Sequence, residues 1–138
     1  MANYLSENSI SFRFIIKKDK IFDLKNIEII TEYLPISDVK KIIASSLFFV
    51  NIQKENQYGL SLRIFEALGY KRKLITTNQD IVAQDFYNEN NIFLISDKNY
   101  EIPLGFLETK YLEIVPEILE RYKLENWILQ VFGIDYDS

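Results

Sequence analysis

The sequence predicts an α/β domain in which a mostly parallel sheet of about five strands lies between layers of helices. Short runs rich in β-branched and aromatic residues recur along the chain, and helical segments alternate with them. Three of the runs are almost continuously apolar, as expected for strands buried on both faces of a parallel sheet. Repeated strand–helix–strand order favours right-handed parallel crossovers. We therefore expect a single three-layer domain over residues 1–138.

Five segments carry the strand pattern. They are Ser11–Lys17, Ile27–Thr31, Leu47–Ile52, Lys73–Thr77 and Ile92–Ile95. Leu47–Ile52 and Leu74–Thr77 are expected at the centre of the sheet because their apolar runs are continuous. Residues 18–26 alone separate the first two strands, whereas a parallel crossover usually needs about a dozen residues or more. Either this connection is abbreviated or the first strand lies antiparallel at an edge.

Apolar spacing and capping residues predict three helices between the strands. Ser37 is expected to cap a helix over residues 38–45. Gly69 is expected to close a helix over residues 60–68, because glycine tolerates the left-handed conformation that often ends a helix. A short third helix is expected over residues 79 to about 87.

The C-terminal part of the chain predicts two further helices. Pro116 fits the first position of one of them, where its missing N–H is harmless. The other covers Glu125–Phe132 and ends at Gly133. The side chains expected to pack this last helix onto the sheet are Trp127, Ile128 and Val131.

The composition excludes several classes of chemistry. The chain has no cysteine and no histidine, so thiolate nucleophiles, disulfides and imidazole bases are absent, and we expect no metal site. A net charge of −4 argues against nucleic acid as a partner. The only tight basic cluster, Lys71-Arg72-Lys73, follows a predicted helix and is expected to complement its negative C-terminal end.

The N-terminus and the apolar runs bear on localisation. The first residues, MANYLSENS, lack the charged and then apolar layout of a signal peptide. The longest strongly apolar run, around Ser46 to Ile52, is far too short to cross a bilayer. We therefore expect a cytoplasmic protein that does not insert into membranes.

The segment Gln57–Asn78 (QYGLSLRIFEALGYKRKLITTN) is the most informative part of the chain. Arg63 and Glu66 lie three positions apart on the polar side of its predicted helix, where such a pair is often only a solvated ion pair. Here the helix directly follows a buried strand and Gly59, at the carboxyl end of the sheet, where α/β folds bind ligands. Helix amides and arginine suit phosphate, and a glutamate can accept two ribose hydroxyls.

The runs Gly59–Gly69 (GLSLRIFEALG) and Lys73–Asn78 (KLITTN) resemble the donor-binding, C-terminal half of GT-B glycosyltransferases. In that family a loop ending in Gly-Leu leads into a helix with Glu-Ala, and a strand ending in Thr follows. The resemblance covers about residues 27–95, and the segment around Asp85–Asn88 is similar to proteins of bacterial polysaccharide assembly, such as capsule or lipopolysaccharide synthesis. It implies a Rossmann-like half-domain that binds a nucleotide-sugar.

The resemblance also implies roles for individual residues. Glu66 would bind the ribose of the nucleotide. Arg63 and the amides of Gly59, Leu60 and Ser61 would face the diphosphate. The segment that contains Tyr33 and Leu34, with the helix that follows it, resembles the loop and helix that flank the base.

The chain departs from the family's pattern in two ways. Many GT-B enzymes carry a second acidic residue at a set distance before the ribose glutamate, but counting back eight from Glu66 reaches Tyr58, and Glu55 is out of register. A GT-B active site also lies between two halves, and the acceptor half, which usually brings the catalytic base, is missing here. We therefore expect a half-domain that is inactive alone, holds no cofactor tightly, and associates with an acceptor-binding partner chain or with itself as a homodimer.

A second interpretation stays open. The same fold can serve as a non-catalytic scaffold or interaction protein of a polysaccharide assembly pathway. Dinucleotide and P-loop interpretations fail, because the four glycines are too scattered for either motif. No catalytic residue, donor sugar or stereochemical outcome is assigned by the sequence.

Overall fold

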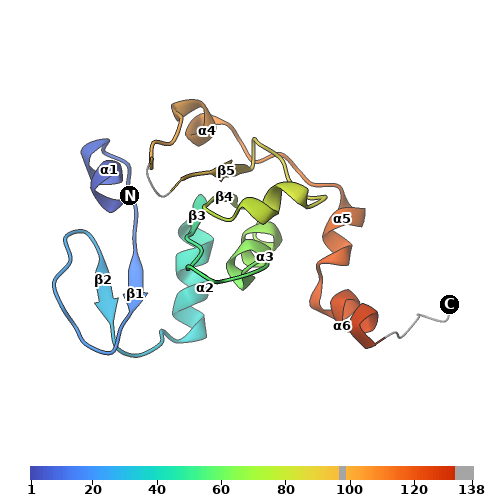
Figure 1. Ribbon diagram of the computed structural model, residues 1–138, viewed down its shortest axis with the longest axis horizontal. Coiled ribbons are helices and arrows are strands. Elements are labelled where there is room, and N and C mark those ends of the chain that lie inside the picture. Colours follow the sequence, from blue (N-terminus) through green and yellow to red (C-terminus); the bar gives the residue numbers. More distant parts are fainter. Residues whose placement is uncertain (97–98, 133–138) are drawn as a thin grey trace. The chain divides into compact units, whose positions relative to one another are not determined.

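The computed structural model describes residues 1–96 and 99–132. It divides the chain into two compact units, and Figure 1 shows most of the first in blue to cyan and the second in green to red. Among the described residues, the first unit comprises residues 1–45 and 99–101, and the second comprises residues 46–96 and 102–132.

The first unit holds a small parallel sheet and two helices. The helices are α1 (Ala2–Glu7) and α2 (Ile36–Ser45), and the strands are β1 (Ile15–Lys17) and β2 (Glu28–Ile30). β1 pairs with β2 in parallel, in the register Ile16 to Ile29. Of the two arrangements left open by the sequence, the abbreviated parallel connection is the correct one. α2 begins at Ile36, so Ser37 lies inside the helix and does not cap it.

The second unit is built around a parallel sheet of β3 (Phe48–Asn51), β4 (Lys73–Thr76) and β5 (Ile92–Leu94), in the order β3-β4-β5. The other elements are α3 (Leu62–Gly69), the 3₁₀ helix η1 (Gln79–Ala83), α4 (Leu104–Glu108), α5 (Pro116–Arg121) and α6 (Leu124–Phe132). α3 packs against β3 and β4. On the opposite face, the Phe106 ring of α4 lies 5.4 Å from Phe93 and 6.0 Å from Phe48, so the sheet is covered on both faces.

Five parallel strands are present as predicted, but they form two small sheets of two and three strands instead of one sheet of about five. β4 is central and fully buried, as expected from its apolar run. The central position expected for β3 is wrong, because its only strand partner among the described residues is β4. A continuous apolar run indicates that a strand is buried on both faces of its sheet. It does not indicate whether the strand has one or two neighbouring strands.

Helix ends also differ from the prediction. The left-handed residue that closes α3 is Lys71, with φ 52°, and not Gly69. The amide of Arg72 donates to the carbonyl of Ala67 at 2.8 Å across this turn, so Gly69 is the last residue of the helix and the left-handed residue lies two positions after it. The helix expected over residues 79 to about 87 is the shorter η1, whose N-cap Asn78 accepts from the amide of Asp80.

The C-terminal helices are present where the sequence predicts them, with Pro116 at the start of α5. Tyr122 anchors this region, because its ring stacks on Phe65 at 5.7 Å and meets Phe86 edge-on at 4.9 Å. The packing expected of α6 is wrong for Ile128 and Val131, whose side chains are 38% and 57% exposed. The side chain of Trp127 and the residue Gly133 lie outside the described residues. No helix of residues 1–96 and 99–132 is long and apolar enough to cross a membrane.

Candidate functional site

The loop between β3 and α3 leaves the carboxyl end of the three-stranded sheet and carries three of the predicted site residues: Gly59, Leu60 and Ser61. Gly59 has φ 75°, in the left-handed region that favours glycine. A Cβ built there would meet no atom within 4 Å, so the backbone conformation and not crowding requires glycine. Ser61 is the N-cap of α3, but its hydroxyl makes no capping bond.

Buried amides and hydroxyls hold this loop in place. The Ser61 hydroxyl donates to Oδ1 of Asn51 at 2.7 Å, and Nδ2 of Asn51 donates to Oγ1 of Thr76 at 3.2 Å. The Nδ2 of Asn78 donates to the carbonyl of Gly59 at 2.9 Å. Asn51, Thr76 and Asn78 are at most 9% exposed. The strand ends of β3 and β4 therefore set the position of the loop through neutral hydrogen bonds in a water-poor site.

Arg63 and Glu66 lie together on α3. The Nη1 of Arg63 is 2.6 Å from Oε2 of Glu66, and the two side chains are 45% and 29% exposed. The guanidinium of Arg63 also lies 5.9 Å from the ring centre of Phe49 on β3. The two side chains predicted to bind the ligand therefore form an ion pair with each other, and both are partly exposed to solvent.

The start of α3 carries no acidic side chain in its first turn. The amide of Ile64 donates to the carbonyl of Ser61 at 3.0 Å, and it is the first amide of the helix to find a partner within it. The preceding amides point out of the helix end, where the macrodipole is positive. Together with Arg63, this end suits an anionic group.

Tyr33 and Leu34 belong to the first unit, in the loop that precedes α2. Tyr33 is 84% exposed, and the Nζ of Lys17 lies 4.7 Å from the centre of its ring. The five residues Gly59, Leu60, Ser61, Arg63 and Glu66 belong to the second unit and are brought together there.

Sequence reasoning missed the polar residues at both ends of the sheet. The pattern of the strands signalled burial at Asn51 and Thr76, but it gave no partner for either of them. Lys73 was expected to complement a helix end, and instead its side chain is only 3% exposed. Its ammonium donates to the carbonyl of Phe106 at 2.7 Å and to the hydroxyl of Thr109 at 2.6 Å. Burial lowers the pKa of Lys73.

Comparisons with protein-family models, with curated proteins and with solved structures find no match to this chain.

Proposed function

We propose that the chain is the nucleotide-sugar-binding half-domain of a GT-B-like glycosyltransferase of bacterial polysaccharide synthesis. The observation that carries the proposal is the glycine-led loop at the carboxyl end of a parallel sheet, which leads into a helix that pairs Arg63 with Glu66. Ligands of α/β proteins bind at this end of the sheet.

The binding chemistry follows from these groups. The amides of Gly59, Leu60 and Ser61 and the guanidinium of Arg63 bind the diphosphate, and the carboxylate of Glu66 accepts from the ribose hydroxyls. The ion pair between Arg63 and Glu66 opens to release both side chains for the ligand. Opening it costs little, because partly exposed ion pairs are worth about 0–1 kcal/mol.

Sugar transfer also requires a general base and an acceptor-binding face, which these residues do not provide. A general base near neutral pH is usually a histidine or a carboxylate whose pKa is raised, and the chain has no histidine. An acceptor-binding partner, or a second copy of this chain, supplies the missing face of the active site. The protein acts in the cytoplasm, where nucleotide-sugars are made and used.

A non-catalytic scaffold is the second candidate, and one observation favours it. α6 exposes Leu124, Val131 and Phe132 by 69%, 57% and 72%. Leu124 and Val131 lie seven positions apart, two turns along one side of the helix, and grouped apolar side chains of this kind mark interaction surfaces. The Arg63–Glu66 pair would then be a surface ion pair of α3.

Calorimetry against UDP-, GDP- and CMP-sugars at about 1 mM tests the proposal. One donor is expected to bind weakly, and Glu66→Ala is expected to weaken it at least tenfold, because the ribose hydroxyls lose their acceptor at a cost of about 1–3 kcal/mol. Glu117→Ala is the matched control, since this exposed glutamate lies on α5 and is expected to leave binding unchanged. Failure of every donor, or equal binding by Glu66→Ala and the parent, would leave the scaffold as the better account.

A further inference from the structure

The second unit holds an open pocket of about 510 Å³ beside β5, away from the residues assigned to the nucleotide-sugar. Its lining residues come from β5, from the loop before it and from α4 with the turn after it. They are Tyr87, Glu89, Asn90, Ile92, Phe93, Leu94, Pro103, Gly105, Phe106 and Thr109.

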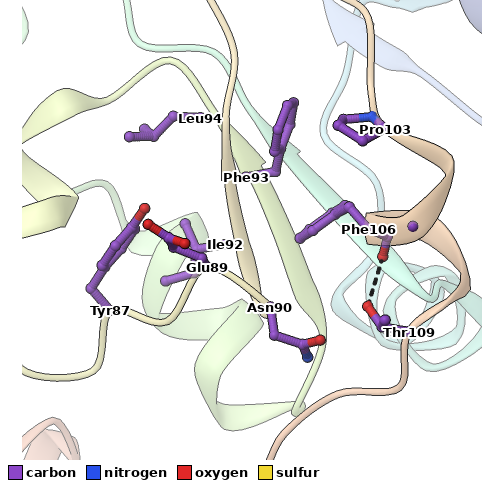
Figure 2. Close-up of a pocket in the computed structure, with 10 residues that line it drawn as sticks. Tyr87, Glu89, Asn90, Ile92, Phe93, Leu94, Pro103, Phe106 and Thr109 are labelled. Carbon is purple, nitrogen blue, oxygen red and sulfur yellow. Dashed lines mark hydrogen bonds between the residues drawn. The ribbon is translucent and has the colours of Figure 1, made fainter.

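The lining shows that the pocket follows the outer edge of β5. All three residues of the strand line it, although successive side chains of a strand point to opposite faces of the sheet. Phe93 lies with Phe106 on the α4 face, so Ile92 and Leu94 lie on the other face. Figure 2 shows the two sets, with Leu94 and Ile92 beside Tyr87 and Glu89, and Phe93 beside Phe106 and Pro103. Because side chains from both faces of the sheet line the same pocket, the pocket lies over the edge of β5.

The edge of β5 presents unpaired backbone groups to this pocket. β5 has β4 as its only strand neighbour in the described residues. The carbonyl of Asn91 accepts from Leu74, and the amide of Ile95 donates to Thr76, so these backbone groups face β4. Successive residues of a strand point their backbone N–H and C=O groups to opposite sides of the strand. The groups of Phe93 therefore also face β4, whereas those of Ile92 and Leu94 face outward. The Ile92 amide already donates to Asn88, and Ile92 is only 3% exposed, so the backbone groups left for an incoming strand in the described residues are the amide and the carbonyl of Leu94.

These groups select the chemistry of an occupant. Donors and acceptors that alternate along a strand edge are matched by the backbone of another strand, with walls on both sides to take its side chains. The walls are largely apolar, with ring and aliphatic side chains. Their one carboxylate is Glu89, and no lysine or arginine lines the pocket. The occupant is therefore an extended segment with apolar side chains and a basic one.

We propose that the edge of β5 is a docking site for an extended, basic peptide segment of a partner protein, which adds to the sheet as a fourth strand. The backbone of the segment pairs with the amide and the carbonyl of Leu94, its apolar side chains enter the hollows beside Phe106 and Tyr87, and its basic side chain meets Glu89. This site is independent of the nucleotide-sugar site.

A second copy of this chain fits the edge less well. The segment that it would offer, residues 88–96 (NENNIFLIS), carries one glutamate and no basic residue. Pairing two such segments would bring carboxylates together without a cation, which is unfavourable at an interface.

The test uses the whole protein and a capped peptide of about six residues in which a single lysine stands among valines, so that valine side chains are present on both faces of the extended peptide. Binding is measured by NMR titration up to about 1 mM. Binding is expected with shifts of the Leu94 amide. Two control peptides probe the mechanism on the unchanged protein. N-methylation of the backbone along one edge of the peptide is expected to weaken binding about tenfold or more, and glutamate in place of lysine is expected to weaken it as well.

Variants of the protein provide a second test of peptide binding. Leu94→Pro removes the outward amide, which an edge strand tolerates, and is expected to abolish binding, whereas Leu94→Ala keeps the amide and retains binding. Glu89→Lys is expected to reverse the preference between the lysine and glutamate peptides. Glu117→Lys makes the same charge change on α5 and is expected to leave the preference as it is.

Three outcomes overturn the proposal. One is the absence of binding by the lysine peptide, and another is equal binding by the N-methylated peptide, which would exclude strand addition. The third is a homodimer in light scattering that Leu94→Pro dissociates, because a second copy would then occupy the edge.

Discussion

The two ends of the three-stranded sheet perform the same task with different chemistry. At the carboxyl end, Asn51, Thr76 and Asn78 hold the loop before α3 through neutral hydrogen bonds. At the amino end, Lys73 and Asn91 hold the segment after α4, and Lys73 does so with a buried ammonium. Asn91 bonds both the carbonyl and the amide of Leu112, at 2.7 and 2.8 Å, as a neighbouring strand would.

The difference shows at which end of the sheet a buried charge destabilises the fold. Neutral groups that satisfy one another in a buried site rigidify it without a charge penalty. The ammonium of Lys73 has two neutral acceptors and the face of the Phe106 ring, 4.5 Å away, but no carboxylate among the described residues. Burial without a counter-charge disfavours its protonated form. The carboxyl end is thus built to hold a loop in one shape, and the amino end bears an uncompensated charge.

The largest effect is expected at the carboxyl end. Asn78→Ala removes a buried side chain, and with it the bond to the part-buried Gly59 carbonyl and the cap of η1. The free energy of unfolding, measured in urea, is expected to fall by about 2–3 kcal/mol. Asn126→Ala is the control, because the bond from its side chain to the Glu120 carbonyl is exposed, and its loss should cost under about 0.5 kcal/mol. Equal losses in the two variants would show that the network does not hold the loop.

The buried charge at the amino end is expected to give a smaller effect of the opposite sign. Lys73→Met keeps the volume and removes the ammonium, and the Thr109 hydroxyl still donates to the Phe106 carbonyl at 3.3 Å. Stability at neutral pH is expected to stay equal or to rise by about 1 kcal/mol. The parent's stability is expected to rise with pH toward 10.5, since the unfolded lysine binds a proton that the folded one, with its lowered pKa, gives up earlier.

The Met variant is expected to lack that rise with pH. Thermal unfolding at several pH values below 10 measures it, before the tyrosines ionise. A parent without the rise, or a variant that loses several kcal/mol at neutral pH, would mean that the ammonium stabilises the fold.

How much of this comparison the sequence predicts depends on how local the signal is. The order of α3 and β4, the start of α5 at Pro116 and the pairing of Arg63 with Glu66 follow from residues close together in the chain. The division into two sheets does not, because strand pairing is decided by contacts between segments far apart in sequence. The same holds for Asn78, whose partner Gly59 lies in another loop.

The end of α3 shows a different kind of failure. Gly69 favours the left-handed conformation more than Lys71 does, yet Lys71 adopts it. The Lys71 ammonium lies 2.7 Å from the carboxylate of Glu113, a contact that no local pattern indicates. For the site itself, a motif predicted the residues, but it did not predict the hydrogen-bond network that fixes their loop.

Tyr111, in the segment held by the amino end, is expected to give a modest gain when altered. Its buried hydroxyl has no hydrogen-bond partner in the described residues. Tyr111→Phe removes this unsatisfied group and is expected to stabilise the protein by about 0.5–1 kcal/mol at neutral pH. Destabilisation there would reveal a partner for the hydroxyl.

The stability of the same variant at alkaline pH provides a second test. Burial, followed by the charge of Glu113, raises the pKa of Tyr111 to about 12. The folded state therefore keeps its proton above pH 10 while the unfolded state loses it, so stability falls as pH rises from about 10 to 12. Tyr111→Phe is expected to reduce this fall without abolishing it, because the pKa of Tyr122 is raised to about 12 as well, by burial and by its bond to Asp85.

The smallest effect is expected on α3, where the carboxyl end meets solvent. A double-mutant cycle with Arg63→Ala and Glu66→Ala is expected to give a coupling energy of about 0.2–0.5 kcal/mol, reduced further by salt, because the pair is partly exposed and three positions apart on one helix. The low value matters for function, since a nucleotide-sugar must separate the two side chains before it can use them. A coupling of several kcal/mol that salt does not screen would mean that the pair is a fixed part of the fold. The ribose role proposed for Glu66 would then be untenable, because its carboxylate would stay with Arg63.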